Sequence, residues 1–398
     1  MIFEKMLAKQ NPSMDASAIR EILKVVSRPG MISLAGGIPS PDAFPMDILP
    51  MLIDNVMGKY AHRAFQYDLS EGFTPLREAL VGYLKDQIGI KVTVDSILIG
   101  SGSQGILDGL GKILISKGDR VAMEAPTYLG AIQAFNPYQP TYRQLETDAD
   151  GLIPDSLERV LKKGGGKFIY LVPTFQNPTG RTLPLNRRIK IAQLIQQYHA
   201  LLIEDDPYSA LRYHGEPVQT IHSLAPENVV YLGTLSKVFA PGLRIGLCVA
   251  PDAIRKYLII AKQGVDLHTA TFSQALSAEY ITGGFLSRQL PLILAHYAPR
   301  QQAMLAALDD YFPTGFKWSR PDGGMFIWLQ GDRGTDMEKI YCRAIKKNVA
   351  FVPGKFFFTR KGDGLETARL NYTMADTATI IRAISILADV IKEAVVNG

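Results

Sequence analysis

The stretch Gly233–Lys237 (GTLSK) and the turn Pro241–Gly246 (PGLRIG) that follows it carry most of the information about the fold. Both come after the apolar run Val229–Leu232, which is typical of a buried strand. Hydroxyl groups and a guanidinium can together hold a phosphate dianion, and a lysine with a lowered pKa reacts with carbonyl groups. The pattern therefore predicts a carbonyl-reactive Lys237 beside a phosphate site, whereas without Arg244 this lysine would be interpreted as a surface residue.

Short apolar runs rich in β-branched residues alternate through the middle of the chain with longer helical patterns, such as Gln104–Ile115 and Asn186–His199. This alternation is typical of an α/β fold in which helices cover both faces of a largely parallel sheet. The expected strands are Ser96–Ile99, Arg120–Met123, Lys167–Val172, Leu201–Glu204, Val229–Leu232 and Ile245–Val249.

The two ends of the chain differ from its middle. Residues 15–27 predict a capped helix, and after about residue 290 long helices mix with short strands such as Gly324–Leu329 and Ala368–Tyr372. We therefore expect a smaller α+β domain beside the large one. The expected division is an N-terminal segment (1–45) that packs with the small domain, a large domain (46–285) and the small C-terminal domain (286–398).

Composition excludes several classes of protein. The chain has 398 residues, of which 47% are hydrophobic and 20% charged, as in a folded globular protein. Its net charge of +5 comes without a long basic run, so we expect no nucleic-acid partner. Two cysteines, Cys248 and Cys342, are too few for a disulfide scaffold and lack metal-ligand spacing. The absence of a targeting segment and of a long uncharged apolar run predicts a cytoplasmic protein without a membrane anchor.

A glycine-rich segment, Gly100–Gly105 (GSGSQG), follows one expected strand and opens an expected helix. Together with Glu124 it resembles a dinucleotide-binding fingerprint, which on its own is a weak signal. More generally, such a turn presents backbone N–H groups and the positive end of the helix dipole to a phosphate. The alternative is a tight turn with capping serines.

Two further loops lie at strand ends. Asp205 and Tyr208 follow the strand Leu201–Glu204, where an α/β sheet places its ligands. They could hold a protonated ring nitrogen and a ring hydroxyl, although a metal-binding acid pair or a helix cap would use the same residues. In Pro173–Gly180 (PTFQNPTG), two prolines and a glycine stiffen a loop that either aims Asn177 or forms a turn without function.

Arg369 lies inside the short apolar stretch Ala368–Tyr372. A charge at such a position needs an anionic partner. That partner is either the carboxylate of a substrate or an acidic side chain of the protein itself.

In this order, the segments resemble the fold-type I aminotransferases that depend on pyridoxal 5'-phosphate. The resemblance covers nearly the whole chain, from about Ser17 to the C-terminal helix. It implies a large domain with a mainly parallel seven-stranded sheet and a smaller α+β domain. The branch of 2-aminoadipate and kynurenine aminotransferases is most similar, as indicated by Leu34–Pro39 (LAGGIP), Glu124–Tyr128 (EAPTY), Phe175–Gly180 (FQNPTG) and Lys262–His268 (KQGVDLH).

The resemblance implies a role for each matching residue at the cofactor. Lys237 would form an imine with the cofactor and later move a proton to and from the substrate Cα. Asp205 would pair with the pyridine nitrogen, Tyr208 and Asn177 would bond the 3'-oxygen, and Tyr128 would stack on the ring. The phosphate would be held by Ser103, Gln104, Thr234, Ser236 and Arg244, with Tyr67 reaching in from the other subunit of a homodimer.

The substrate side is implied in the same way. Arg369, helped by Asn177 and the Gly37 backbone, would clamp the α-carboxylate. Ser17 and Arg20 would face the substrate side chain, where a cation favours acidic donors such as 2-aminoadipate. Because this branch often also accepts aromatic and branched-chain amino acids, we expect broad specificity. The expected reaction is ping-pong transfer of the amino group from an L-amino acid to 2-oxoglutarate.

Three other interpretations use the same residues differently. Another reaction on the same scaffold, such as β-elimination, is not excluded by the lysine and phosphate motifs. A transcription regulator with this fold would carry a DNA-binding module upstream, for which a family-like pattern beginning near residue 17 is expected to leave no room. A dinucleotide-dependent dehydrogenase, suggested by the glycines, gives no role to Lys237, Arg244 or Arg369.

Overall fold

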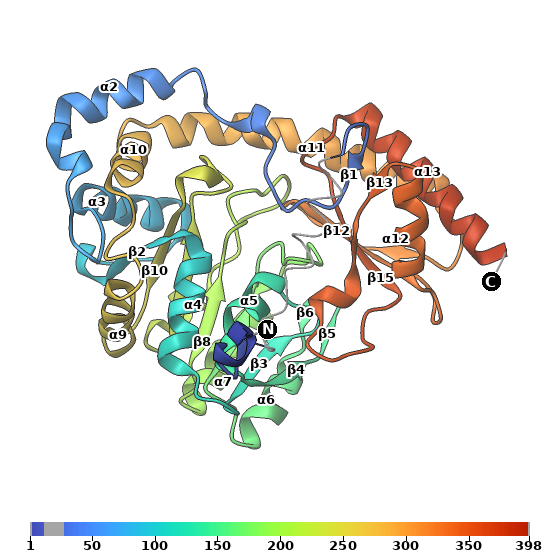
Figure 1. Ribbon diagram of the computed structural model, residues 1–398, viewed down its shortest axis with the longest axis horizontal. Helices are drawn as coiled ribbons and strands as arrows, with labels where there is room; N and C mark the ends of the chain where they lie inside the picture. Colours follow the sequence, from blue (N-terminus) through green and yellow to red (C-terminus); the bar gives the residue numbers. More distant parts are fainter. Residues whose placement is uncertain (1, 12–27, 397–398) are drawn as a thin grey trace.

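The computed structural model describes residues 2–11 and 28–396. Its centre is a seven-stranded sheet in the order β2-β10-β9-β8-β7-β3-β4 (Figure 1). Strand β10 runs antiparallel to both of its neighbours, and the other adjacent pairs are parallel. The strands are β2 (Ile97–Ser101), β3 (Arg120–Glu124), β4 (Thr141–Leu145), β7 (Phe168–Leu171), β8 (Leu202–Asp205), β9 (Val229–Thr234) and β10 (Ile245–Val249).

Helices pack on both faces of this sheet, so its inner strands are buried on both sides and mostly apolar rather than alternating, with acidic residues at the carboxyl ends of β3 and β8. One buried cluster joins the sheet to α4, α5 and α10, and a second joins it to α6, α7 and α8. The helices of this part of the molecule are α2 (Leu49–Tyr60), α3 (Thr74–Tyr83), α4 (Gly102–Leu114), α5 (Leu129–Phe135), α6 (Pro154–Lys162), α7 (Leu185–Gln197), α8 (Ile221–Leu224), α9 (Asp252–Gln263) and α10 (Thr271–Thr282). A short hairpin, β5 (Thr147–Asp148) and β6 (Gly151–Leu152), lies between β4 and α6.

A second, antiparallel sheet in the order β11-β12-β15-β14 forms the other part of the molecule. It contributes to a separate buried cluster with residues of α11, α12 and α13. Its strands are β11 (Lys317–Trp318), β12 (Phe326–Gln330), β14 (Val352–Pro353) and β15 (Thr367–Asn371), and its helices are α11 (Phe285–Tyr311), α12 (Met337–Lys346) and α13 (Thr377–Val396). The N-terminal segment joins this part, because β1 (Ile32–Ser33) pairs in parallel with β13 (Val349–Ala350).

The expected fold class is confirmed, and every strand expected from the sequence lies within two residues of an observed one. The expected helix at residues 15–27 lies outside the described residues. The division at residues 45 and 285 stays a prediction. Among the described helices, none is both long and apolar enough to cross a membrane.

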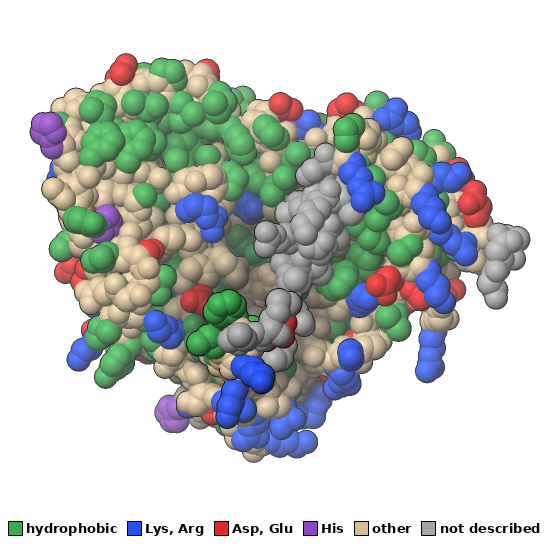
Figure 2. All heavy atoms as spheres, viewed as in Figure 1, with side chains coloured by type: hydrophobic (Ala, Val, Ile, Leu, Met, Phe, Trp, Pro, Cys, Tyr) green, Lys and Arg blue, Asp and Glu red, His purple; other side chains and the backbone are tan. Residues whose placement is uncertain are grey.

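Apolar side chains gather on the surface around α2 and the short 3-10 helix η4 (Ala61–Phe65). Figure 2 shows a group of hydrophobic side chains over α2. Exposed patches of this kind mark interfaces more often than scattered apolar residues do. The exposed large hydrophobic residues from α2 to the loop just after η4 are Met51, Ile53, Met57, Phe65, Tyr67 and Leu69, which we call the α2–η4 patch.

Candidate active site

A cavity of about 230 Å³ lies where the carboxyl ends of the parallel strands face the N-terminal segment and β15. This is the edge at which open α/β sheets bind their ligands. Every predicted site residue that the structure describes, apart from Tyr67, lines it. The lining residues are Gly37, Ile38, Ser103, Gln104, Tyr128, Val172, Asn177, Asp205, Pro207, Tyr208, Thr234, Ser236, Lys237, Arg244 and Arg369.

Lys237 enters the cavity from the turn after β9. Its Nζ donates a hydrogen bond to the carbonyl oxygen of Gly37, 3.0 Å away. Burial of the amine, together with the nearby charges of Arg369 and Arg244, lowers the pKa of Lys237 to about 8. About a tenth of the amine is therefore neutral at pH 7, far more than for an ordinary lysine, and addition to a carbonyl group requires this neutral form.

Asp205 ends β8 and is buried. Its Oδ2 accepts a hydrogen bond of 2.6 Å from the hydroxyl of Tyr170, while its Oδ1 is buried without a hydrogen-bond partner among the described residues. Burial raises the pKa of Asp205 to about 7, the hydrogen bond from Tyr170 opposes this rise, and the neighbouring Asp206 adds to it. A buried acceptor of this kind is complementary to a charged N–H group in the cavity.

A hydrogen-bonded chain crosses the cavity between the two sheets. Arg369 on β15 donates from Nη1 to Oδ1 of Asn177 (2.8 Å) and from Nη2 to the carbonyl of Ala35 (2.7 Å). Asn177 in turn donates to the hydroxyl of Tyr208 (3.4 Å). The three segments that supply Arg369, Asn177 and Ala35 are far apart in the sequence, so the contact depends on how the two sheets pack.

Arg369 has no acidic partner within ion-pair distance in the part of the chain that the structure describes. Its guanidinium lies 4.3 Å from the ring centre of Phe326 and 5.1 Å from that of Phe357, and its Nε is buried without a partner. Burial lowers the pKa of Arg369 to about 10, which leaves it charged at neutral pH. Among the described residues, the structure therefore excludes the alternative in which the anionic partner of Arg369 is an acidic side chain of the protein itself.

The opposite end of the cavity is suited to a dianion. Helix α4 begins at Gly102, so its first backbone N–H groups and its dipole point into this end. Gly102 has φ +71°, and a Cβ added to it would collide with the guanidinium of Arg244. A Cβ on Gly246 would likewise collide with the backbone of Gly102. The hydroxyl of Thr234 donates to Ser236 Oγ at 2.9 Å, which brings both hydroxyls to this end.

Comparison with known proteins identifies the chain. Residues 51–387 match the family described as aminotransferase class I and II.

The chain belongs to the class I and II aminotransferases.

The aromatic-amino-acid aminotransferase 1 of Thermococcus litoralis is 44% identical over 398 residues, covering 98% of this aminotransferase and 95% of the relative. The crystal structure of the Pyrococcus horikoshii kynurenine aminotransferase, in complex with PMP, has a TM-score of 0.94 at 44% identity and covers 98% of both chains. The α-aminoadipate aminotransferase of Thermus thermophilus, in complex with N-(5'-phosphopyridoxyl)-L-leucine, has a TM-score of 0.92 at 36% identity and covers 100% of both chains.

The cofactor of this aminotransferase is pyridoxal 5'-phosphate. The residues present fit it on structural grounds. The buried Oδ1 of Asp205 can accept from a donor in the cavity, the Lys237 amine has a lowered pKa, and the start of α4 with Arg244 forms a cradle that a Cβ on Gly102 would fill. These three features lie around one cavity, as binding of a single flat, phosphorylated aldehyde requires.

One described site residue, Tyr67, does not line the cavity. Tyr67 is 78% exposed and packs edge-on against His268, with ring centres 5.7 Å apart. Ser17 and Arg20 lie outside the described residues. Tyr67 therefore does not serve the cavity of its own chain.

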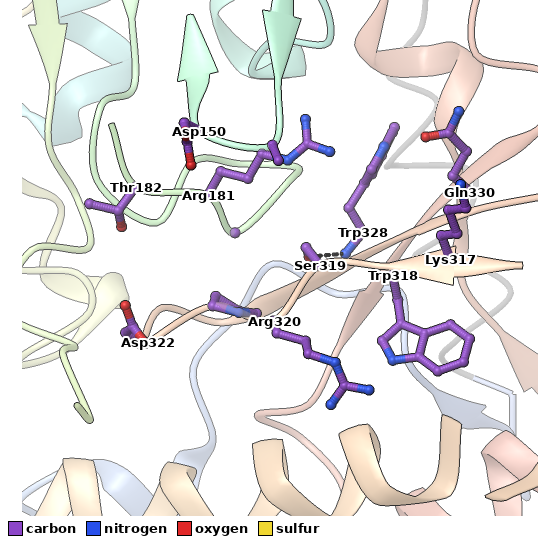
Figure 3. Close-up of a pocket in the computed structure, with 13 residues that line it drawn as sticks. Asp150, Arg181, Thr182, Lys317, Trp318, Ser319, Arg320, Asp322, Trp328 and Gln330 are labelled. Atoms are coloured by element: carbon purple, nitrogen blue, oxygen red, sulfur yellow. Dashed lines mark hydrogen bonds between the residues drawn. The ribbon is translucent and has the colours of Figure 1, made fainter. Parts of the chain in front are cut away.

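A second cavity, of about 480 Å³, lies between the loop before α7 and the strands β11 and β12 (Figure 3). Arg320 points away from Arg181 in this view and pairs with Asp309. Lys317, which also lines this cavity, is exposed. Asp150 pairs with Arg187, with its Oδ2 3.7 Å from the Arg187 Nη2. The charged groups of this cavity thus face solvent or other side chains, and we assign the chemistry to the first cavity.

Sequence reasoning missed two residues around the site. Tyr170 lies within an apolar strand pattern, and the available signal is that a buried tyrosine hydroxyl usually needs a partner, here Asp205. Gln176 precedes Asn177, and its amide donates to the carbonyl of Pro126 at 2.9 Å and accepts from the backbone N–H of Thr179. The position of Gln176 directly before Asn177 was the available signal.

Proposed function

We propose that this aminotransferase moves the amino group of an aromatic, branched-chain or 2-aminoadipate L-amino acid to 2-oxoglutarate by a ping-pong mechanism. One observation carries the proposal: the buried Arg369, which has no acidic partner among the described residues, faces the same cavity as the Lys237 amine. A carboxylate and an amine of one amino acid can therefore be engaged together. The names of the aromatic, kynurenine and α-aminoadipate relatives support aromatic and 2-aminoadipate donors, and the leucine adduct in the Thermus thermophilus structure supports branched-chain donors.

The proposed roles of the cofactor-side residues follow from their positions. Asp205 holds the ring nitrogen with its free Oδ1, and Tyr208 and Asn177 hold the ring oxygen. Tyr128 covers the ring, since it lines the cavity beside the start of α5. The phosphate lies against the start of α4 and is held by Ser103, Gln104, Thr234, Ser236 and Arg244.

Bound pyridoxal phosphate supplies an electron-withdrawing ring that stabilises negative charge at the substrate Cα. The remaining work belongs to the chain. Arg369 orients the substrate through its carboxylate, together with Asn177 and the Gly37 backbone. The Lys237 amine, with its pKa near 8, can accept the Cα proton and return it at neutral pH.

Breadth of specificity is proposed to depend on the N-terminal helix expected at residues 15–27. Ser17 and Arg20 would face the substrate side chain, and Arg20 would favour acidic donors. Replacing Arg20 by Ala should reduce kcat/KM for 2-aminoadipate and glutamate more than for leucine or phenylalanine. An equal loss on both groups of donors, or no loss on either, would remove Arg20 from the specificity argument.

A homodimer with shared active sites is the proposed assembly. The α2–η4 patch exposes Phe65 by 67% and Tyr67 by 78%, a large apolar surface for a free protomer. In the proposed dimer, Tyr67 reaches the phosphate end of the partner's cavity. This explains why it lies outside the cavity of its own chain.

The decisive experiment is an amino-donor screen with 2-oxoglutarate as acceptor, in which formation of glutamate is measured. We expect glutamate from aromatic, branched-chain and 2-aminoadipate donors. A second assay offers a β-substituted amino acid without an acceptor. Release of pyruvate and ammonia there, with no glutamate in the first assay, would favour β-elimination and overturn the proposal.

A further inference from the structure

Tyr170 is a buried residue whose hydroxyl contacts Asp205 on the side away from the cavity lining. It lies on β7, its side chain is fully buried, and its hydroxyl donates to Oδ2 of Asp205 at 2.6 Å. Neither Tyr170 nor its hydroxyl lines the cavity. Asp205 does line the cavity, and its other oxygen, Oδ1, is buried without a hydrogen-bond partner among the described residues.

The register of the parallel strands creates this contact. Tyr170 pairs with Ile203 on β8, and Asp205 lies two residues further along β8, on the same face. A long side chain reaches such a diagonal neighbour. Tyr170 thus meets the carboxylate at the point where β8 ends and the cavity begins.

The same diagonal step recurs one strand away. Tyr231 on β9 pairs with Glu204, and its hydroxyl donates to Asp206, two residues beyond Glu204, at 3.1 Å. Tyr231 is also fully buried, and Asp206 does not line the cavity. The chain therefore contains two adjacent tyrosine–aspartate pairs, of which one faces the cofactor site and the other does not.

The surroundings of Asp205 oppose its ionisation. Burial and the neighbouring Asp206 raise its pKa, and the hydrogen bond from Tyr170 lowers it. The pKa of Tyr170 itself is raised well above its ordinary value, by burial and by Asp205, so that the tyrosine stays a neutral donor. Tyr128 and Tyr208 are the other titratable groups facing Tyr170.

We propose that Tyr170 is a positioning residue for the cofactor ring: by occupying one oxygen of Asp205, it favours the ionised carboxylate and leaves the other oxygen available to the ring nitrogen. The inference rests on the role proposed above for Asp205. A neutral or rotated Asp205 would hold the protonated ring nitrogen less well. The ring would then withdraw electrons less effectively, although Tyr170 touches neither cofactor nor substrate.

The test compares Tyr170→Phe with Tyr231→Phe, since each substitution removes one buried hydroxyl from one aspartate. Equilibrium binding to the cofactor-free protein is measured with pyridoxal phosphate and with its analogue in which carbon replaces the ring nitrogen. We expect Tyr170→Phe to weaken binding of pyridoxal phosphate by roughly tenfold or more, as loss of a hydrogen bond to a charged group implies. Binding of the analogue should be weakened much less, because it offers no ring nitrogen to Asp205.

Tyr231→Phe should change the affinities for the two ligands by the same factor relative to wild type. The melting temperature of this variant reports how much the loss of one buried hydroxyl destabilises the fold. If Tyr170→Phe weakens both ligands equally, or neither, the residue is merely structural and the inference is wrong. Asp205→Asn separates this outcome from failure of the proposed function. We then compare the ratio of the affinities for pyridoxal phosphate and its analogue in Asp205→Asn and in wild type. If this ratio is smaller in Asp205→Asn, the role of Asp205 stands even though that of Tyr170 falls.

Discussion

At the scale of single residues, Lys237 shows how neighbours set reactivity. Burial and the charges of Arg369 and Arg244 bring its pKa to about 8, against about 10.4 for an ordinary lysine. Only the neutral amine attacks a carbonyl, and the neutral fraction rises with pH up to the pKa. We predict that the rate at which cofactor-free enzyme captures pyridoxal phosphate rises up to about pH 8 and then levels off.

The measurement is the growth of visible absorption after mixing, between pH 6 and pH 10. Lys237→Ala serves as the control and should show no such growth at any pH. A rate that continues to rise by about a factor of ten per pH unit up to pH 10 would mean that the amine titrates as an ordinary lysine.

Arg369 gives a second prediction at this scale. Its guanidinium is the group proposed to bind the α-carboxylate, and it is already desolvated between Phe326 and Phe357. We predict that Arg369→Lys lowers kcat/KM for amino acids by roughly 30-fold or more, because the planar fork that matches a carboxylate is lost in a buried site.

The matched substrate for this test is the amine obtained by removing the carboxyl group from the same donor. Half-reaction rates with the amino acid and with the amine are compared in wild type and variant. The preference for the amino acid should shrink in Arg369→Lys. An unchanged preference would show that the carboxylate binds elsewhere.

At the scale of elements, the loop Phe175–Gly180 depends on Gln176. Its side-chain amide donates to the carbonyl of Pro126 and accepts from the backbone N–H of Thr179. Its backbone carbonyl accepts from the N–H of Gly180 at 2.6 Å. We predict that Gln176→Leu costs about 1–3 kcal/mol of stability, since buried polar groups lose their partners. It should also lower kcat/KM, because Asn177 is no longer held opposite Arg369.

Gln301→Leu is the matched control for this loop. Gln301 is also buried, and its amide donates to the carbonyl of Pro321 at 2.7 Å, away from the cavity. Chemical unfolding and kinetics of both variants should show similar losses of stability but a loss of kcat/KM confined to Gln176→Leu. Equal kinetic losses would mean that Gln176 supports the fold in general and not Asn177.

At the scale of the whole molecule, the exposed Tyr67 and the rest of the α2–η4 patch predict that two chains share each site. Lys237→Ala and Tyr67→Ala should each be strongly impaired as separate proteins. Unfolding and refolding them together, or expressing them together, should restore activity toward about a quarter of wild type, since random pairing leaves one intact site in half of the dimers. Activity no higher than the sum of the separate variants would show that Tyr67 does not act across an interface.

Much of the architecture follows from local pattern. The strands β7, β8 and β9 are recognisable because a strand buried on both faces begins as an uninterrupted apolar run, as in Phe168–Leu171, Leu202–Ile203 and Val229–Leu232. The direction of β10 was not recognisable, since an apolar run has the same pattern in either direction. Its antiparallel course brings Gly246 against the backbone of Gly102, where a Cβ on Gly246 would collide. Close packing of these two segments therefore requires glycine at this position.

The order of residues along the chain is sufficient to predict that Lys237, Asp205 and Asn177 line one cavity, because each lies at or after a strand end where side chains converge. It is not sufficient for Tyr170, whose partner is set by strand register, or for the partners of Arg369, which lie on the other sheet and the N-terminal segment. Hydrogen bonds act over about 3 Å, whereas sequence pattern extends only along one strand or helix. Contacts between elements are therefore decided by how the two sheets pack together.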